Sequence, residues 1–425
     1  MRIGENFCPG VLHAVPAKDG LLLRIRIPGG LIGASQLEAL AALSSRFADG
    51  RVEITSRGNL QLRAMREEYL PMIELGIASA GLLPSPQHDR VRNIVASPLA
   101  GLHREEILDT RPLVLELDRR LQAEILFTEL HPKFSFGFHG DHRRFSHDLD
   151  DLSLEACDDG SHLRLSISGV ATDYCVTTED AVDSLVEAAK CCLRLAKSSG
   201  VPVRAKRIAA VPGAVNQLID SLSLMLVPCS TAAPLPEFFE IFPGVSPGAR
   251  YGLINIIPSV PLGRLDSHQA SAIAEVVRQW NGDLRLAPWR GIVLGAMPAT
   301  AAEAVFEVLQ KVGLSWNGQD GFHGLAACAG STGCDASLAD VRSNATSLAQ
   351  RLAGKVAPSG WTVNFSGCEK QCARRHGASA ELIAYDSGYL VKINGQTIQL
   401  NCPADYAIDT FATFHAQSLS EAATL

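Results

Sequence analysis

The sequence predicts an α+β protein built from two related halves. Three observations lead to this prediction: an internal repeat, strand and helix patterns that recur in the same order in both copies, and a length of 425 residues, which exceeds what one compact core usually holds. Hydrophobic residues make up 47% of the chain and charged residues 20%, a globular composition that argues against disordered or collagen-like proteins.

The repeat appears when the chain is offset against itself by 232 residues. Residues 20–65 then align with residues 252–297 without a gap, and the identities include Ile25 with Ile257. Each copy alone is small for an independent core. We therefore expect the two copies, the products of an ancient duplication, to pair about a pseudo-twofold axis.

Each copy has the pattern of a βαββα unit. Residues 21–27 alternate Leu and Ile with arginine, the period-two pattern of a half-buried strand. Ser35 can cap the helix that follows, and Ser267 can do the same in the second copy. Short strands are predicted near 52–55 and 60–63, and a second helix follows them.

Four domains are expected along the chain. The proline-rich run 228–247 is interpreted as the crossover between the halves, and a helix over 178–197 is predicted to close the first half. The expected domains are a first ferredoxin-like half-domain at 1–83, a larger α/β domain at 84–230, the crossover with the second half-domain at 231–315, and a second larger α/β domain at 316–425.

The charge pattern excludes several classes of partner. A net charge of −7 offers no basic field for a nucleic acid. The longest uncharged stretch, residues 221–236, is short and contains three prolines, so no membrane helix is expected. The first residues lack the pattern of a secretory signal. We expect a cytoplasmic protein whose eleven cysteines are thiols or metal ligands rather than a disulfide framework.

Four cysteines near the C-terminus have the spacing of a metal-cluster site. Cys328 and Cys334 are separated by five residues, Cys368 and Cys372 by three, and 33 residues lie between the pairs. Four soft thiolates suit an iron–sulfur cluster or zinc, and the five-residue gap fits structural zinc sites poorly. The sequence favours a [4Fe-4S] cluster, with zinc or unliganded core thiols as alternatives. The other cysteines are expected to be buried apolar thiols: Cys8, Cys157, Cys175, Cys191, Cys192, Cys229 and Cys402.

The cysteine spacings, the duplicated units and the segments 23–30 and 55–61 together resemble the nitrite and sulfite reductase family, whose members carry a [4Fe-4S] cluster and usually sirohaem. Within it, residues 8–10 and 366–373 are most similar to the precorrin-3B synthases. The resemblance implies paired ferredoxin-like half-domains with two larger α/β domains around cluster and tetrapyrrole. It implies O2-dependent hydroxylation of precorrin-3A at C20 with lactone formation; the alternative is a sirohaem-dependent nitrite or sulfite reductase.

Basic residues are the candidates for tetrapyrrole binding, because tetrapyrroles are polycarboxylates and an acidic protein needs cations directed into its cleft. The candidates are Arg24, Arg26, Arg57 and Lys133. By the resemblance, Arg24 and Arg57 match positions that grip carboxylates, and Lys133 matches the first of two lysines. Ser135 stands where the second lysine is expected, which weakens the case for reductase-type sirohaem binding. The alternative for an arginine on an alternating strand is a solvated face.

Asn59 and Gln61 are two further candidates. They alternate with Leu60 and Leu62, so both side chains can face one side of the sheet and hydrogen-bond a ligand. A polar sheet edge is the alternative.

Histidines around Lys133 form a second candidate metal site for a mononuclear non-haem iron, since imidazole and carboxylate ligands with open positions suit O2 chemistry. A polar surface loop is the alternative. No G-x-G-x-x-G dinucleotide fingerprint follows a predicted strand, so electrons are expected from an external NAD(P)H-linked donor protein. The residues of this candidate iron site are His131, His139, His142, His147 and Asp141.

Overall fold

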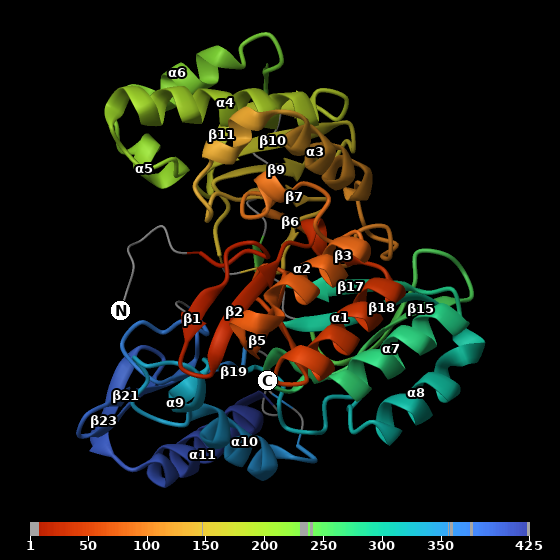
Figure 1. The fold of residues 1–425 in the computed structure, drawn as a ribbon, viewed down its shortest axis with the longest axis vertical. Coiled ribbons are helices and arrows are strands. Elements are labelled where there is room, and N and C mark those ends of the chain that lie inside the picture. Colours follow the sequence, from red (N-terminus) through yellow and green to blue (C-terminus); the bar gives the residue numbers. More distant parts are fainter. Residues whose placement is uncertain are drawn as a thin grey trace.

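The computed structural model describes residues 8–146, 148–229, 237–238, 241–355, 357, 360–374 and 377–422, without the side chains of 237–238 and 420–422. Figure 1 shows three parts along the long axis: an α/β domain at the top, two half-domains side by side in the middle, and the C-terminal domain, in blue, at the bottom. Part of the expected crossover, residues 230–236 and 239–240, lies outside the described residues.

The first half-domain is a sheet covered on one face by two helices. Its predicted strands near 52–55 and 60–63 are present as β4 and β5, and the strand predicted over 21–27 is β2. The elements are β1 (Val15–Ala17), β2 (Gly20–Ile25), β3 (Leu31–Ile32), α1 (Ala34–Phe47), β4 (Arg51–Ile54), β5 (Leu60–Met65) and α2 (Leu70–Ser79).

The second half-domain repeats this order, with β14 at the edge of its sheet where β1 lies in the first. Its sheet has the order β14-β15-β18-β17-β3, and the first sheet has the order β1-β2-β5-β4-β16. The elements are β14 (Gly244–Pro247), β15 (Leu253–Ile257), β16 (Arg264–Asp266), α7 (Ser267–Gln279), β17 (Asp283–Ala287), β18 (Gly291–Pro298) and α8 (Ala302–Lys311).

The two half-domains exchange a short strand. β3 of the first copy pairs with β17 of the second through Ile32 and Leu284, and β16 of the second pairs with β4 of the first through Leu265 and Val52. Gly30 lies at the crossing with a φ of 68°, and a Cβ there would be 2.2 Å from the Leu286 carbonyl oxygen. A larger residue is therefore excluded where the chain passes into the partner sheet.

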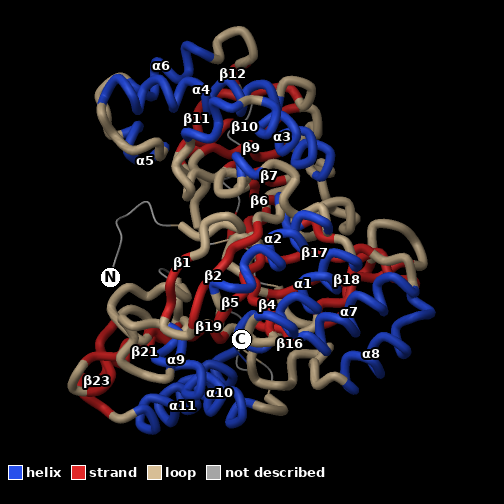
Figure 2. Tube along the Cα trace, viewed as in Figure 1, coloured by secondary structure: helices blue, strands red, loops and turns tan. Residues whose placement is uncertain are grey.

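One hydrophobic core serves both half-domains. It joins Leu40 and Leu62 of the first copy to Ile273 and Leu294 of the second, all of them buried. Helices α1 and α7 pack against each other over the two sheets (Figure 2). This shared core and the exchanged strands are the pairing that the repeat predicts.

The helix starts differ from the predicted caps. α1 follows Gly33, whose backbone N–H donates to the Gln36 side chain, so Ser35 lies inside the helix. α7 begins at Ser267, and the Asp266 carboxylate accepts from the Gln269 N–H. Aspartate caps as well as serine does, so the sequence located each helix but placed its cap one or two residues late.

The α/β domain that follows the first half-domain has a six-stranded sheet with the order β12-β11-β10-β9-β7-β6. The helix predicted over 178–197 is α4, which ends at the left-handed Gly200. The elements are β6 (Ile94–Ala96), α3 (Arg111–Ala123), β7 (Phe136–His139), β8 (Arg143–Arg144), β9 (Leu152–Ala156), β10 (His162–Ile167), β11 (Val170–Thr177), α4 (Ala181–Ser199), α5 (Ala205–Ala209), α6 (Ala214–Ser221), β12 (Val227–Pro228) and β13 (Glu237–Phe238), which pairs with β8.

The C-terminal domain has a five-stranded sheet with the order β19-β20-β21-β22-β23, in which β19, β20 and β21 are parallel. α10 and α11 pack with it around a core that includes Phe365 and Phe411. The elements are β19 (Leu325–Ala327), α9 (Gly330–Gly333), α10 (Val341–Leu352), β20 (Val363–Ser366), β21 (Ala380–Tyr385), β22 (Gly388–Ile393), β23 (Gln396–Cys402) and α11 (Ala404–Ala422).

Two of the cysteines predicted to be thiols are bonded to each other. Cys175 in β11 and Cys229 after β12 form a disulfide with Cα atoms 5.3 Å apart. β11 and β12 are paired, so strand pairing brings together two residues that are 54 positions apart, and their sequence spacing carries no signal of it. The expectation of thiols is wrong for this pair.

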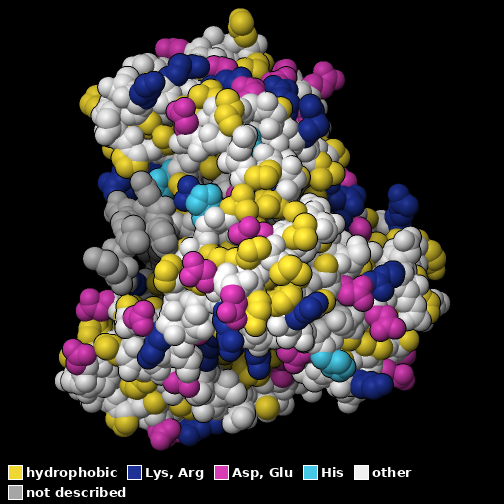
Figure 3. Space-filling view, in the orientation of Figure 1, with side chains coloured by type: hydrophobic (Ala, Val, Ile, Leu, Met, Phe, Trp, Pro, Cys, Tyr) yellow, Lys and Arg dark blue, Asp and Glu magenta, His cyan; other side chains and the backbone are white. Residues whose placement is uncertain are grey.

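The surface in Figure 3 carries charges of both signs, with apolar side chains across the middle of the view. Exposed apolar residues on α2 are Met72 and Leu75. Within the described residues, no helix is both long and apolar enough to cross a membrane.

Candidate functional site

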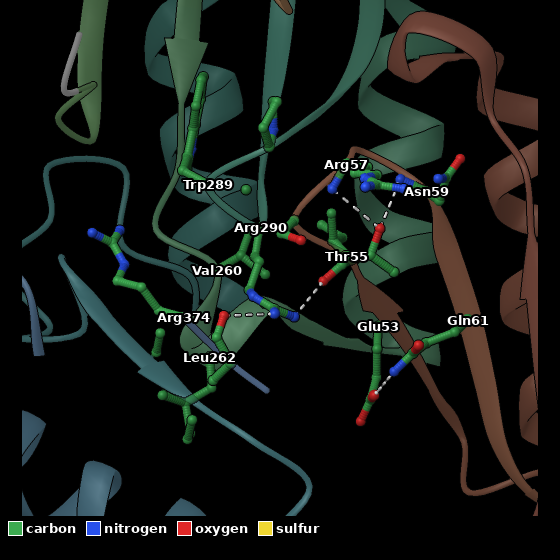
Figure 4. Close-up of a pocket in the computed structure, with 18 of the residues that line it drawn as sticks. Glu53, Thr55, Arg57, Asn59, Gln61, Val260, Leu262, Trp289, Arg290 and Arg374 are labelled. Carbon is green, nitrogen blue, oxygen red and sulfur yellow. Dashed lines mark hydrogen bonds between the residues drawn. The ribbon is translucent and has the colours of Figure 1, made fainter. Parts of the chain in front are cut away.

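A cavity of about 630 Å³ lies where the half-domains meet the two larger domains. β2, β4 and β5 of the first half-domain and the β17–β18 turn of the second contribute to its wall, as do the segments near Lys133 and Cys328 (Figure 4). All six residues predicted to contact a tetrapyrrole line it: Arg24, Arg26, Arg57, Asn59, Gln61 and Lys133.

Arg26 is a buried cation and Arg24 a half-buried one, and both have unused donors. Arg26 is 3% exposed, and its Nε and Nη1, like the Nε of Arg24, have no hydrogen-bond partner. Burial lowers the pKa of Arg24 to about 10 and, with the positive charge of Arg24, that of Arg26 to about 9. Arg26 therefore does not lie on a solvent-exposed face of the strand. The cavity leaves room for anions that would accept hydrogen bonds from the unused donors of both arginines.

Arg57 projects from a tight turn between β4 and β5. The Thr55 side-chain oxygen accepts from the N–H groups of Arg57 and Asn59, and Gly58 takes a left-handed φ of 65°. Arg57 Nη1 donates to the Lys133 carbonyl oxygen at 3.3 Å, and Arg57 Nε lies 4.0 Å from Asp148. The turn thus holds Arg57 against the segment that carries Lys133.

The amide side chains have partners within the protein. Asn59 Oδ1 accepts from the Ile27 N–H at 2.7 Å. Gln61 accepts from Arg24 at 3.1 Å and donates to Glu53 at 2.5 Å. The geometry therefore favours Asn59 and Gln61 as residues that position the backbone and Arg24.

Glu53 is the buried centre of this network. Arg342 Nη2 and Arg264 Nε lie 2.6 and 2.7 Å from its Oε1, and Gln61 donates to its Oε2. Burial alone would raise the pKa of Glu53, but Arg342, Arg264 and Arg63 outweigh it and hold the pKa below its usual value. One carboxylate therefore joins the two half-domains and the C-terminal domain at the cavity.

The four candidate cluster cysteines lie on packed segments at one edge of the C-terminal sheet. Cys328 follows β19, and Gly367-Cys368 follows the parallel neighbour β20. The Gly367 N–H donates to Cys328 Sγ at 3.3 Å, and its carbonyl oxygen accepts from the Leu338 N–H in the loop that begins at Cys334. Cys328 and Cys372 also line the cavity.

A single-ion site is not formed within the described residues: no three His, Cys, Asp or Glu side chains are grouped to hold one metal ion. The proposed histidine site is dispersed, since His139 lies 3.7 Å from Asp150 and His142 2.6 Å from Asp158, and His147 is outside the described residues. The structure does not support a mononuclear iron there. A cubane cluster differs, because each cysteine binds a separate iron.

Comparison with known proteins identifies the duplicated units. A family model described as the nitrite/sulfite reductase ferredoxin-like half domain matches residues 13–80 and 251–312. The chain is 29% identical over 406 residues to the precorrin-3B synthase of Sinorhizobium sp, covering 93% of this chain and 83% of that protein. The chain is therefore similar to proteins of the nitrite/sulfite reductase family over most of its length.

Nitrite reductases are also similar to this chain over most of its length. The ferredoxin–nitrite reductase of Synechococcus elongatus is 27% identical over 405 residues, with 89% of this chain and 78% of the relative covered. The structure of the Mycobacterium tuberculosis NirA protein superposes with a TM-score of 0.76 at 20% identity, covering 92% and 79% of the two chains. The predicted duplicated α+β fold is confirmed, and the chain is an enzyme of oxidoreductase type.

The sequence analysis did not single out several polar and aromatic residues of the cavity, among them Glu53, Trp289, Arg290, Arg342 and Arg374. The repeat offset places Trp289 over Arg57 and Arg290 over Gly58, so the repeat itself contained the signal for two of them. Arg290 donates to the carbonyl oxygens of Ile54 and Ala373 and thereby joins both half-domains to the cysteine segment (Figure 4). No pattern in the sequence marks Arg342 or Arg374.

Proposed function

We propose that this enzyme is a precorrin-3B synthase-like monooxygenase that hydroxylates precorrin-3A at C20 and closes a lactone. One oxygen atom of O2 enters the substrate, the other leaves as water, and an electron donor supplies two electrons, with two protons from solvent. The donor is proposed to be an external NAD(P)H-linked protein.

The unsatisfied donors of Arg24 and Arg26 are the observation that carries the proposal. They line a cavity that also contains Arg57 and Lys133, so several cations face one volume that is large enough for a macrocycle's edge. Carboxylates accept charge-assisted hydrogen bonds from such donors. A polycarboxylate substrate such as a precorrin matches this requirement.

The cysteine segments support a [4Fe-4S] cluster at Cys328, Cys334, Cys368 and Cys372. The donor set is four thiols, a backbone N–H already points at Cys328 Sγ, and glycines let the backbone approach closely. When bound, such a cluster supplies one-electron transfer. Cys328 and Cys372 line the same cavity as the arginines, so the residues present fit a redox centre beside the substrate.

The protein's own residues bind and orient the substrate in this proposal. Arg24 and Arg26 hold carboxylates on the side of β2, and Arg57 and Lys133 hold them on the opposite segment. Gln61 and Glu53 fix the direction of Arg24. Fixed contacts at the edge of the macrocycle would orient one meso carbon toward Cys328 and Cys372. This orientation would determine which position is oxidised.

The deciding experiment uses the holoenzyme with precorrin-3A, a reductant and 18O2. We expect one 18O atom in the product and the other in water, as followed by mass spectrometry. Cys372→Ser should lose the iron and the activity, whereas Cys402→Ser, a buried cysteine outside the site, should keep both. Unlabelled product, or labelling that survives the loss of iron, would contradict the proposal.

A sirohaem-dependent nitrite or sulfite reductase is the second candidate, because reductases are among the relatives. Ser135 argues against it: the serine is fully buried, its N–H donates to Asp151, and it does not line the cavity. The spectrum of the purified enzyme separates the two. Sirohaem gives strong Soret and red bands, whereas a cluster alone gives a broad brown shoulder.

A further inference from the structure

Three cysteines far from the cluster segments in sequence gather in the α/β domain of the first half. Cys175 and Cys229 form the disulfide between β11 and the residue after β12, and Cys157 Sγ lies 3.6 Å from Cys175 Sγ. Cys157 is 7% exposed and Cys175 is 3% exposed, whereas Cys229 is only half-buried. Neither the proposed reaction nor the cluster uses any of them.

The local fold holds the thiol against the disulfide. Cys157 follows β9 and opens a tight turn, in which its N–H donates to the His162 carbonyl oxygen and its carbonyl oxygen accepts from the Gly160 N–H. Cys175 pairs with Arg164 on β10, the strand between β9 and β11. The contact between the two sulfurs is therefore set by the sheet register and not by a mobile loop.

We propose that these cysteines form a thiol–disulfide exchange site. The Cys157 thiolate attacks Cys175 Sγ, a Cys157–Cys175 bond forms, the Cys175–Cys229 bond breaks, and Cys229 leaves as a thiolate that takes up a proton. The proton lost by Cys157 passes to solvent. One disulfide and one thiol are present before and after the step, so no oxidant or reductant is consumed.

Exchange moves the reactive thiol from the interior to the surface. Before it, the thiol is the buried Cys157, and after it the thiol is the half-buried Cys229. Cys229 would then be the point at which a small or protein thiol or disulfide reacts. The step also removes the covalent link between β11 and β12, which leaves β12 held by the Tyr174–Pro228 and Cys175–Val227 pairs.

The charges around Cys157 set the pH response of the site. Burial raises the pKa of the Cys157 thiol, Asp159 and Asp158 add to this, and Arg164 opposes it. The thiolate is the attacking species, so exchange should be slow at neutral pH and should quicken about tenfold per pH unit below that pKa.

Alkylation of the oxidised holoenzyme tests the proposal. Native protein is treated with iodoacetamide from pH 7 to pH 9, denatured in acid, and mapped by peptide mass spectrometry without reduction. We expect carbamidomethyl label on Cys229 together with a Cys157–Cys175 bridge, increasing with pH. In Cys157→Ser, label at Cys229 should be at least about tenfold lower. Cys191→Ser, a buried cysteine on α4 of the same domain, is the control and should behave as wild type.

A second variant tests the proposal without relying on the folding of Cys157→Ser. Cys229→Ser, oxidised with glutathione disulfide, should carry the Cys157–Cys175 bridge while its circular dichroism matches that of the wild type. The proposal is overturned if both cysteines of that folded variant remain alkylatable. It is also overturned if the label in the wild type appears only on Cys157, or if Cys157→Ser leaves the labelling of Cys229 unchanged.

Discussion

Arg26 shows at the level of one residue how the cavity is adapted to an anion. Its pKa in the folded protein, about 9, lies well below the ordinary value of an arginine because of burial and the neighbouring Arg24. The unfolded chain therefore binds the proton more tightly than the folded one. The resulting penalty on folding is fully present below about pH 9 and shrinks as the pH rises from there toward the ordinary pKa of an arginine.

We predict that Arg26→Met raises the melting temperature of the ligand-free protein at pH 7 and weakens tetrapyrrole binding by about 10- to 100-fold, because it removes a buried unsatisfied cation and a charge-assisted contact. Calorimetry and titration with uroporphyrin, a polycarboxylate tetrapyrrole, measure the two effects. Arg66→Met, at an exposed arginine, is the control. A destabilised variant with unchanged affinity would make Arg26 a structural residue.

The charge of Glu53 stabilises the folded protein, whereas the charge of Arg26 destabilises it. Its pKa is lowered below the ordinary 4.5, so its contribution to stability is complete above pH 4.5 and is lost as the pH falls through the lowered value. Glu53→Gln takes the carboxylate partner from the half-buried Arg342 and leaves Arg264 with Asp49 alone, and we expect a loss of about 3 kcal/mol in the free energy of unfolding by urea at pH 7. Glu38→Gln, at an exposed pair, should change it by less than about 1 kcal/mol. Equal losses in the two variants would refute the role assigned to Glu53.

At the scale of elements, the turn after β20 controls the cysteine segments. A Cβ on Gly367 would lie 1.8 Å from Ser337 Oγ, so Gly367→Ala must displace the loop that contains Cys334. We expect this variant to bind less iron per chain, and the added substitution Ser337→Gly to restore part of it, since the next atom is then the Ser337 Cα at 3.4 Å.

Iron content and visible absorption measure that prediction. Gly33→Ala is the control, because its Cβ would meet nothing closer than 3.5 Å and its φ is an ordinary −85°. Full iron binding in Gly367→Ala would show that the two loops do not depend on each other.

Elements with a strong local pattern were predictable from sequence. The alternation in β2 and the periodicity of α1 and α4 located these elements to within a few residues. Short strands without a pattern, such as the two residues of β3, were not, because their pairing partner lies in the other copy. The Cys175–Cys229 bond was missed for the same reason: only tertiary pairing brings the two cysteines together.

The residues of the candidate site also fall into those that the sequence predicted and those that it did not. The arginines of β2 and the β4–β5 turn were found from alternation and resemblance. The hydrogen bonds of Gln61 and Asn59 to other protein groups could not be predicted. A sequence pattern indicates which side of a strand a side chain is on, but it does not identify the hydrogen-bond partner on that side. Arg342 comes from a helix of another domain and could be placed only by the tertiary fold.

At the scale of the molecule, the half-domains should unfold as one unit. Leu265 on β16 is buried in the shared core but pairs with the first sheet. We predict that Leu265→Ala costs about 3 kcal/mol and that amide hydrogen exchange quickens in both half-domains together. Leu185→Ala, in the core of the α/β domain, should quicken exchange there instead. Loss of protection confined to the second half-domain would contradict a common unit.

The strand exchange between the two half-domains also has a consequence for the symmetry of the cavity. Two identical subunits that completed each other's sheets would present identical turns to the space between them. Because both copies are carried on one chain, the β4–β5 turn retains Arg57 while its counterpart holds Trp289 and Arg290. A macrocycle bound as proposed, with different substituents on each side of its rim, would contact two different surfaces, and a scaffold with two related halves would then distinguish the positions of that rim.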